Sequence, residues 1–341
     1  MKTPKEPLDT ISVTGLSQAR EMVVTPIRKQ APAFSVPAVI EYSGQAASKR
    51  FIEFFTATIR NTNTRQAYAQ SCRQFFDAMR TLDLSLTQIE PVHVALYIEQ
   101  LGKDKSAPTI KQHLAAIRQL FDYLVIGQII PTNPASSVKS PKHVVTEGKT
   151  PILTDEEIRS LFGQFDERSL IDVRDRALLS IMLYSFARVG AVVKLRVRDF
   201  YRQSTKAWFV LDEKGGKQNR VPAHHQAAEW VTQYIDRAGI AEQRDMPLFR
   251  SVLGRTGQLT DRAMARSNVF LMIRKRTSKV GLPPEIGCHS FRGSGITNYL
   301  RNGGTIERAA SIAGHASTKT TQLYDRRTDL VDQAEIERIR F

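Results

Sequence analysis

The sequence has little cysteine, no long hydrophobic run and no excess of acidic residues. Its two cysteines, Cys72 and Cys288, lie far apart, which excludes a disulfide framework and a zinc site built on cysteines. No run of about 18 apolar residues occurs, so no membrane-spanning helix is predicted. The first residues, MKTPKEPLDT, lack the apolar core of a signal peptide, and we therefore expect a cytoplasmic protein.

Basic residues are what the chain has in excess. Lys and Arg number 49 against 34 Asp and Glu, giving a formal net charge of +15. The excess is spread along the chain: residues 1–150 carry 18 basic and 12 acidic residues, and residues 151–341 carry 31 and 22. A polyanion that contacts both halves would neutralise this charge. A soluble basic protein without such a partner is the alternative at this point.

The length of 341 residues predicts two domains, and the hydropathy pattern divides the chain. Residues 1–46 are interrupted by prolines and are predicted to be a disordered tail. Residues 47–131 show apolar stripes at helical spacing and are predicted to form a compact helical domain. Residues 132–150, with prolines, lysines and small polar residues, are typical of a linker that either lies across a polyanion or is a solvated tether.

The clearest helix of the first domain is PTIKQHLAAIRQLFDYLV. Its apolar residues Ile110, Leu114, Ile117, Phe121 and Leu124 recur at the spacing of a core-facing edge. The other face carries Lys111, His113 and Arg118.

The second domain, residues 151–341, is predicted to be mainly helical with a small β-sheet. A capping box of Thr154 and Glu157 begins one helix, and an apolar helix, RALLSIMLYSFA, follows. The pattern then alternates around Gly215 and Gly216, which predicts a β-hairpin, before helices return from Gln226.

Polar residues that could take part in catalysis occur in four segments of this domain: FARVGAVVKL, DEKGGKQNRVP, CHSFRGSG and AGHASTKTTQLY. The residues they supply are Arg188, Lys214, His289, Arg292, His315 and Tyr324. Taken singly, each has a plain structural reading: an arginine that caps a helix, a lysine at a turn, a solvated His–Arg pair, a tyrosine in a core. Their joint occurrence in one order favours a functional site.

In these segments and their order the sequence resembles the tyrosine recombinase and phage-integrase family, including Xer-type recombinases. The resemblance covers residues 151–330 and extends more weakly to the helical domain, where NTRQAY and the Ile110–Leu124 helix resemble the family's core-binding domain. It implies a site-specific DNA recombinase that closes as a clamp around duplex DNA. Such an enzyme cleaves through a 3′-phosphotyrosyl intermediate and exchanges strands through a Holliday junction, for integration, excision or resolution of a mobile element.

The resemblance also implies roles for the six residues. Tyr324 would be the nucleophile, Arg188, Arg292 and His315 would stabilise the transition state, His289 would assist deprotonation and Lys214 would be the general acid. The chemistry agrees, because paired arginines suit a phosphodiester and a phenol both attacks and leaves. No metal and no cofactor are expected.

The expected partners are double-stranded DNA with a specific site and further copies of the chain. The basic residues expected to contact DNA are Arg65, Lys111, Arg118, Lys139, Lys142 and Lys217. A homotetramer on two sites is implied, with the tail 331–341 docked on a neighbouring protomer; docking on its own domain is the alternative. The protein would act at the nucleoid.

Three positions depart from the family's pattern. Phe186 stands where a glycine is usual, Ala191 where an acid is usual, and Gly293 where a histidine is common. These departures put the fine support of Arg188 and Arg292 in question. A type IB topoisomerase, a non-cleaving DNA-binding relative and a basic scaffold protein stay open as alternatives.

Overall fold

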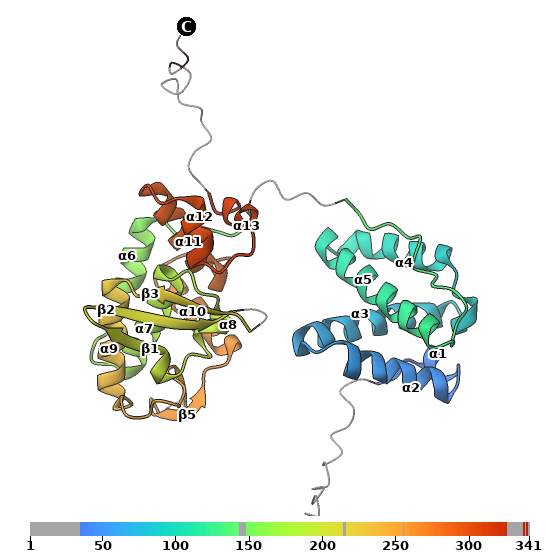
Figure 1. Cartoon of the computed structure of the whole chain (residues 1–341), viewed down its shortest axis with the longest axis horizontal. Coiled ribbons are helices and arrows are strands. Elements are labelled where there is room, and N and C mark those ends of the chain that lie inside the picture. The colour runs from blue at the N-terminus through green and yellow to red at the C-terminus, as the bar shows by residue number, and fades with distance from the viewer. Residues whose placement is uncertain are drawn as a thin grey trace, which may run out of the picture. The chain divides into compact units, whose positions relative to one another are not determined.

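The computed structural model describes residues 35–142, 148–213, 216–254 and 256–325, together with residues 337 and 339. The chain divides into two compact units, residues 1–144 and 145–341, and each is described by itself (Figure 1). Among the described residues no helix is long and apolar enough to cross a membrane.

Every regular element in the described part of the first unit is a helix or a helical turn. Its elements are α1 (Ala38–Glu41), α2 (Gln45–Glu53), the π-helical turn η1 (Phe54–Thr58), α3 (Thr62–Thr81), the 3₁₀ turn η2 (Leu86–Gln88), α4 (Pro91–Asp104) and α5 (Ala107–Ile126). Asn61 caps α3 by accepting hydrogen bonds from the amides of Asn63 and Thr64. Edge-to-face phenylalanine contacts dominate the core; Phe75, for example, contacts Phe76 and Phe121.

Two expectations for this unit need correction. The described chain is ordered before Ala47, because Val39 and Ile40 of α1 are buried in the core; the rest of the predicted tail, residues 1–34, lies outside the described residues. His113, expected on the polar face of its helix, is buried, and its Nδ1 lies 3.1 Å from the hydroxyl of Tyr97. A buried imidazole is tolerated there because its hydrogen bond is made within the core.

The second unit is built around one buried helix, α7 (Leu170–Tyr184), which shorter helices and strands surround. Its helices are α6 (Asp155–Gly163), α7 (Leu170–Tyr184), α8 (Val189–Val192), the 3₁₀ turn η3 (Val197–Asp199), α9 (His225–Ala238), α10 (Arg266–Lys279), α11 (Cys288–Arg301), α12 (Ile306–Ile312) and α13 (Thr318–Gln322). Its strands are β1 (Phe200–Gln203), β2 (Lys206–Asp212), β3 (Gln218–Pro222), β4 (Arg250–Val252) and β5 (Leu259–Ala263). The predicted class, mainly helical with a small sheet, is confirmed.

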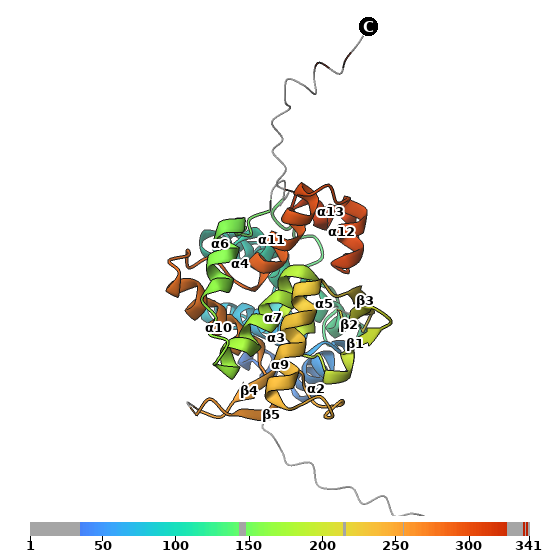
Figure 2. The ribbon, with the colours of Figure 1, turned by 90° about the vertical axis from the view of Figure 1, so that its left-hand side faces the viewer.

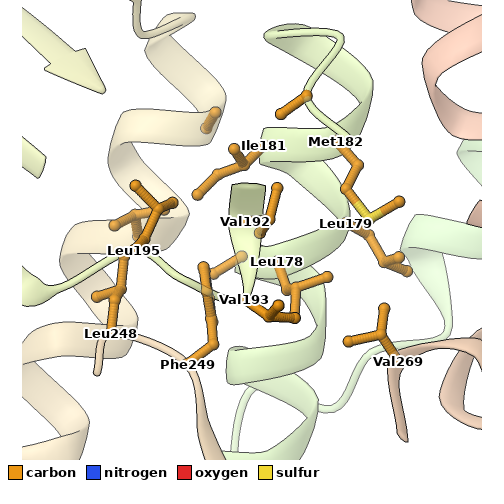
Figure 3. Close-up of a cluster of buried hydrophobic side chains, with 14 of the residues drawn as sticks. Leu178, Leu179, Ile181, Met182, Val192, Val193, Leu195, Leu248, Phe249 and Val269 are labelled. Atoms are coloured by element: carbon orange, nitrogen blue, oxygen red, sulfur yellow. The ribbon is translucent and has the colours of Figure 1, made fainter. Parts of the chain in front are cut away.

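Helix α7 is buried along nearly its whole length. It packs against α9 and α11, and Figure 2 shows α7 and α9 side by side. Leu178, Leu179, Ile181 and Met182 of α7 meet apolar side chains from α8, α10 and the segment before β4 (Figure 3). A helix buried on every side needs apolar partners all round it, which explains the nearly continuous apolar run of its second half, from Ala177 to Leu183.

The predicted β-hairpin is formed by β2 and β3, with Gly216 in the turn at a positive φ of 79°. Strand β1 pairs with β2 to make a three-stranded antiparallel sheet, and β4 pairs with β5 in a separate ribbon. Neither β1 nor the ribbon is anticipated by the hydropathy pattern, because strands of three to five residues carry too little alternation.

A buried group of ion pairs joins α7 to α10. Arg276 donates from Nη2 to Asp172 (2.7 Å) and Asp175 (2.8 Å), and Asp175 also accepts from Arg174 (2.7 Å). The guanidinium of Arg276 lies over the ring of Phe165, 4.9 Å from its centroid. The charges of this group are balanced inside the protein.

Candidate active site

Helix α11 owes its position to the small residues that follow Arg292. A Cβ atom at Gly295 would lie 2.0 Å from the carbonyl oxygen of Leu183, so only glycine lets α11 approach α7 this closely. Ser294 accepts a hydrogen bond from the amide of Leu153 at 2.8 Å and thereby fixes the chain that leads into α6. The sequence HSFRGSG is therefore a packing motif as well as the source of two candidate functional side chains, His289 and Arg292.

Arg292 is the largest fully buried side chain of the chain's described part, with 1% of its surface exposed. It donates hydrogen bonds to the carbonyl oxygens of Phe186 and Ala313, the latter at 2.7 Å. Burial and the nearby charge of Arg188 lower the pKa of Arg292 to about 10, whereas Glu213 and Tyr324 act in the opposite direction. No carboxylate in the described residues forms an ion pair with this guanidinium.

Arg188 stands at the N-terminus of α8 and is about one-third exposed. Its Nη1 donates to a carboxylate oxygen of Glu213, which is almost completely buried. The two arginines are close enough for each to act on the same neighbours, since both lower the pKa values of His289 and His315.

The two histidines lie on either side of the buried arginine in sequence. His289 is in the first turn of α11, solvent-accessible, and desolvation followed by the charges of Arg292 and Arg188 lowers its pKa. His315 follows α12, and the same causes lower its pKa to about 4. Its Nδ1 lies 2.8 Å from the hydroxyl of the buried Thr321. Both imidazoles are therefore neutral near pH 7.

Tyr324 lies two residues after the end of α13 and is partly buried against α11. Its carbonyl oxygen accepts a hydrogen bond from the hydroxyl of Thr297 at 2.7 Å. Its ring stacks nearly parallel to that of His315, with 6.2 Å between centroids. A Cβ atom at Gly293 would lie 3.2 Å from Cδ1 of this ring. The structure thus brings Tyr324, His315 and Arg292 together.

Lys214 lies outside the described residues, as does Gly215 beside it. The residues on both sides of them are described: the amide of Glu213 donates to the carbonyl oxygen of Lys217 at 2.8 Å, which closes the hairpin. Asn219 of β3 donates to the carbonyl oxygen of Ile312 at 2.9 Å, so the hairpin is attached to the end of α12. Lys217 is exposed.

The basic residues expected to contact DNA fall into two groups. Lys139 and Lys142 are exposed and Lys111 is half-buried. Arg65 instead donates twice to the carbonyl oxygen of Ile59, at 2.9 and 2.7 Å. Arg118 donates to the carbonyl oxygens of Ala135 (3.2 Å) and Val138 (2.6 Å) and so attaches the segment after α5 to that helix. These two guanidiniums serve contacts within the protein.

The three departures from the family's pattern have visible consequences. Phe186 adopts a φ of 54°, a conformation that costs a non-glycine residue about 1–2 kcal/mol, and its ring occupies the space beside Gly295. Ala191 is buried and carries no charge, so the carboxylate beside Arg188 comes from Glu213. Gly293 leaves room for the ring of Tyr324.

Sequence reasoning did not identify Glu213, Thr297 or Thr321. One signal pointed to Glu213: it continues the inward-facing alternation of Phe209 and Leu211, where an acidic residue is out of place. Thr297 is one helical turn beyond Gly293, and nothing in the sequence distinguishes it from other helix residues. Thr321 belongs to a threonine-rich run in which any of several hydroxyls was available.

Comparison with known proteins assigns both units. The family model described as "Phage integrase family" matches residues 151–330, and that described as "Phage integrase, N-terminal SAM-like domain" matches residues 49–127. The tyrosine recombinase XerC of Escherichia coli O157:H7 (strain EC4115 / EHEC) is 30% identical over 222 residues, which cover 65% of this chain and 70% of the relative.

Two solved structures show the same fold. A crystal structure of the XerH site-specific recombinase bound to difH substrate aligns with a TM-score of 0.61 at 17% identity, covering 87% of this chain and 95% of that one. A lambda integrase dimer bound to a COC′ core site aligns with a TM-score of 0.61 at 16% identity, covering 82% and 78%. The chain belongs to the phage integrase family and is a tyrosine-type site-specific DNA recombinase.

Proposed function

We propose that this recombinase cleaves a DNA strand by attack of the Tyr324 hydroxyl on a phosphodiester held by Arg188 and Arg292. The observation that carries the proposal is the buried guanidinium of Arg292, which forms no ion pair with a carboxylate within the described residues and which is close enough to Tyr324 for the two to interact electrostatically. A positive charge kept in a desolvated site without a carboxylate in direct contact suits an anion that arrives from outside.

The proposed step exchanges one P–O bond for another. The phenolic oxygen of Tyr324 attacks phosphorus, the bond to the 5′ oxygen breaks, and a 3′-phosphotyrosine forms. The phenolic proton passes to His289, whose lowered pKa leaves it neutral and able to accept it. Lys214 supplies a proton to the departing 5′ oxygen. Attack of a 5′ hydroxyl on the phosphotyrosine reverses the step and reseals the strand without another source of energy.

His315 contributes a hydrogen bond instead of a charge. Its pKa of about 4 makes the ring neutral at working pH. If the Thr321 hydroxyl donates to Nδ1, the ring proton resides on Nε2, from which it can be donated to a phosphate oxygen. Thr321 would thus select the useful tautomer of His315.

The proposed substrate is duplex DNA with a specific recombination site, in the cell interior. Exposed Lys139, Lys142 and Lys217 are the candidates for phosphate contacts, together with Lys111. We extend the proposal to four protomers acting through a Holliday junction, because a lambda integrase tetramer bound to such a junction shares the fold (TM-score 0.58). The tail expected to dock on a neighbour, residues 331–341, lies outside the described residues except Glu337 and Ile339.

The test is incubation with a nicked suicide substrate, which traps a covalent protein–DNA adduct. Wild-type protein should form the adduct, and Tyr324→Phe should form none while binding DNA with similar affinity, because the lost hydroxyl supplies chemistry and few phosphate contacts. Tyr299→Phe is the matched control, since Tyr299 belongs to the same apolar cluster. Adduct formation by Tyr324→Phe would contradict the assignment.

A further inference from the structure

The acid before Lys214 occupies an unusual position. Phe209, Leu211 and Glu213 alternate onto the buried face of the hairpin, and the Glu213 side chain has only 4% of its surface exposed. One of its oxygens accepts from Arg188. The other, Oε1, is buried and has no hydrogen-bond partner among the residues that the structure describes. A carboxylate kept in this state costs free energy that an apolar residue would not.

The surroundings of Glu213 hold it close to the reacting groups. Gly314 adopts a positive φ of 60°, and a Cβ atom there would lie 3.1 Å from Cγ of Glu213. Gly314 directly precedes His315, so the carboxylate packs under the turn that carries this histidine. The hydrogen bond from Asn219 to the carbonyl oxygen of Ile312 attaches the other strand of the hairpin to the same turn.

The charges of the cluster explain what the carboxylate does there. Desolvation and, after it, repulsion by Arg188 lower the pKa of Arg292, and Glu213 opposes that effect. In the described residues, Arg188 uses one of its five N–H donors, and it uses it on Glu213. A long side chain that is one-third exposed would otherwise sample many rotamers.

We propose that Glu213 is a positioning residue that holds Arg188 against the hairpin and turns its remaining N–H donors toward the DNA phosphate. The inference rests on the proposed function, because it assigns Glu213 an action on Arg188, one of the two arginines that hold the phosphodiester in that reaction. Glu213 contacts no reacting atom; it acts through Arg188.

The test measures the rate of covalent adduct formation on nicked suicide DNA. Glu213→Gln should be slower on the order of a hundredfold, because a misplaced phosphate ligand loses that much rate. The matched control is Asp212→Asn, which removes the same charge from the adjacent exposed residue and should leave the rate within about twofold. A Glu213→Gln rate equal to that of the control would overturn the inference.

Two further measurements separate positioning from a general structural effect. In the presence of Arg188→Ala, Glu213→Gln should cause no additional loss, because its effect passes through that arginine. Losses that multiply would overturn the inference. A substrate with sulfur at the 5′ bridging oxygen should not restore the rate of Glu213→Gln; restoration would show that Glu213 acts on Lys214 instead.

Glu213→Asp covers the case in which Glu213→Gln fails to fold. It keeps the charge but withdraws the carboxylate by one methylene, and we expect about a tenfold loss that is absent when Arg188 is alanine. A rate equal to wild type would overturn the inference. Wild-type protein that forms no adduct would overturn the proposed function itself, whatever Glu213 does.

Discussion

The surroundings of two buried arginines in the second unit, Arg276 and Arg292, shift their pKa values in opposite directions. Arg276, on α10, pairs with carboxylates of α7. Arg292, on α11, donates to carbonyl oxygens that lie just beyond the ends of α7 and α12. Desolvation alone lowers the pKa of Arg276, but hydrogen bonds with Asp172 and Asp175 outweigh it and raise that pKa. For Arg292, desolvation and the charge of Arg188 prevail, and its pKa falls to about 10.

The difference separates a charge that is neutralised inside the protein from one that we propose to be functional. Arg276 is buried and donates from Nε, Nη1 and Nη2 to Asp172 and Asp175, so its charge is neutralised inside the protein. Arg292 donates to two backbone carbonyls, which orient it without neutralising it. Burying a charge without an ion-pair partner in contact destabilises the folded protein, which supports our proposal that a DNA phosphate is the partner of Arg292.

The largest expected effect is a loss of stability when Arg276 is replaced. Arg276→Ala leaves Asp172 and Asp175 without their shared partner, and we expect it to reduce the free energy of unfolding by about 3–5 kcal/mol. Cleavage by the fraction that stays folded should change little. Urea unfolding and adduct formation at low temperature measure the two quantities. A strong loss of cleavage with normal stability would contradict a purely structural role of Arg276.

Arg292→Ala should show the reverse pattern. Loss of a transition-state donor costs about 3–4 kcal/mol, so adduct formation should slow roughly a hundred- to thousandfold. Stability should fall less than in Arg276→Ala, because no carboxylate is left without a partner. A cleavage rate within a few-fold of wild type would remove Arg292 from the proposed site.

Lys214→Ala tests the hairpin's contribution to the same site. We expect a loss of about a hundredfold on ordinary DNA, the lower range for a general acid. A substrate with a 5′ bridging sulfur should restore the rate, since a thiolate departs without a proton. Lys217→Ala is the control, and rescue of Lys217→Ala instead would mean that the wrong lysine of the hairpin was chosen.

Gly293→Ala is a smaller perturbation next to Arg292. The new Cβ would lie 2.7 Å from Cδ1 of Ile152 and 3.2 Å from Cδ1 of Tyr324, so the tyrosine ring must shift by a few tenths of an ångström. We expect about a tenfold slower cleavage with unchanged DNA affinity. Gel-shift titration and adduct kinetics measure both; an unaltered rate would show that Tyr324 moves freely from this position before it reacts.

Acidification should remove the stability contributed by His315 and that contributed by Asp172 in different pH ranges. The pKa of His315 is about 4 in the folded protein against 6.5 ordinarily, so the unfolded chain binds more protons and stability falls as pH drops from about 6.5 to about 4. Desolvation raises the pKa of Asp172, but the hydrogen bond from Arg276 outweighs it and keeps the pKa below 3.8; stability from Asp172 is therefore lost only at lower pH.

Urea unfolding of wild type and His315→Asn at pH 7.5 and 4.5 checks the first range. The wild-type protein should lose more stability between these two values than the variant does. An equal loss would show that His315 is not the group responsible.

The helical elements were predictable where the sequence repeats an apolar period over several turns. The Ile110–Leu124 helix, the capping box at Thr154 and the hairpin at Gly216 are all present in the structure. Helix α1 was missed because four residues cannot display a period, although Val39 and Ile40 are buried. His113 was misplaced because residue type indicates polarity but not the local hydrogen bond that permits burial.

The residues of the proposed site were found through their order along the chain and their resemblance to a family. Their supporting contacts could not be found in that way. Arg188 pairs with an acid 25 residues away, and Arg292 is oriented by carbonyl oxygens 106 and 21 residues away. Such contacts depend on how α8, α11, α12 and the hairpin pack, which a single sequence does not display.

The most direct test of the central claim is to locate the covalent bond. Wild-type protein trapped on nicked suicide DNA would be digested with protease and nuclease, and the modified peptide sequenced by mass spectrometry. We expect one modified peptide, with the nucleotide phosphate attached to the phenolic oxygen of Tyr324. A modified residue elsewhere, or cleaved DNA without any attached protein, would contradict it.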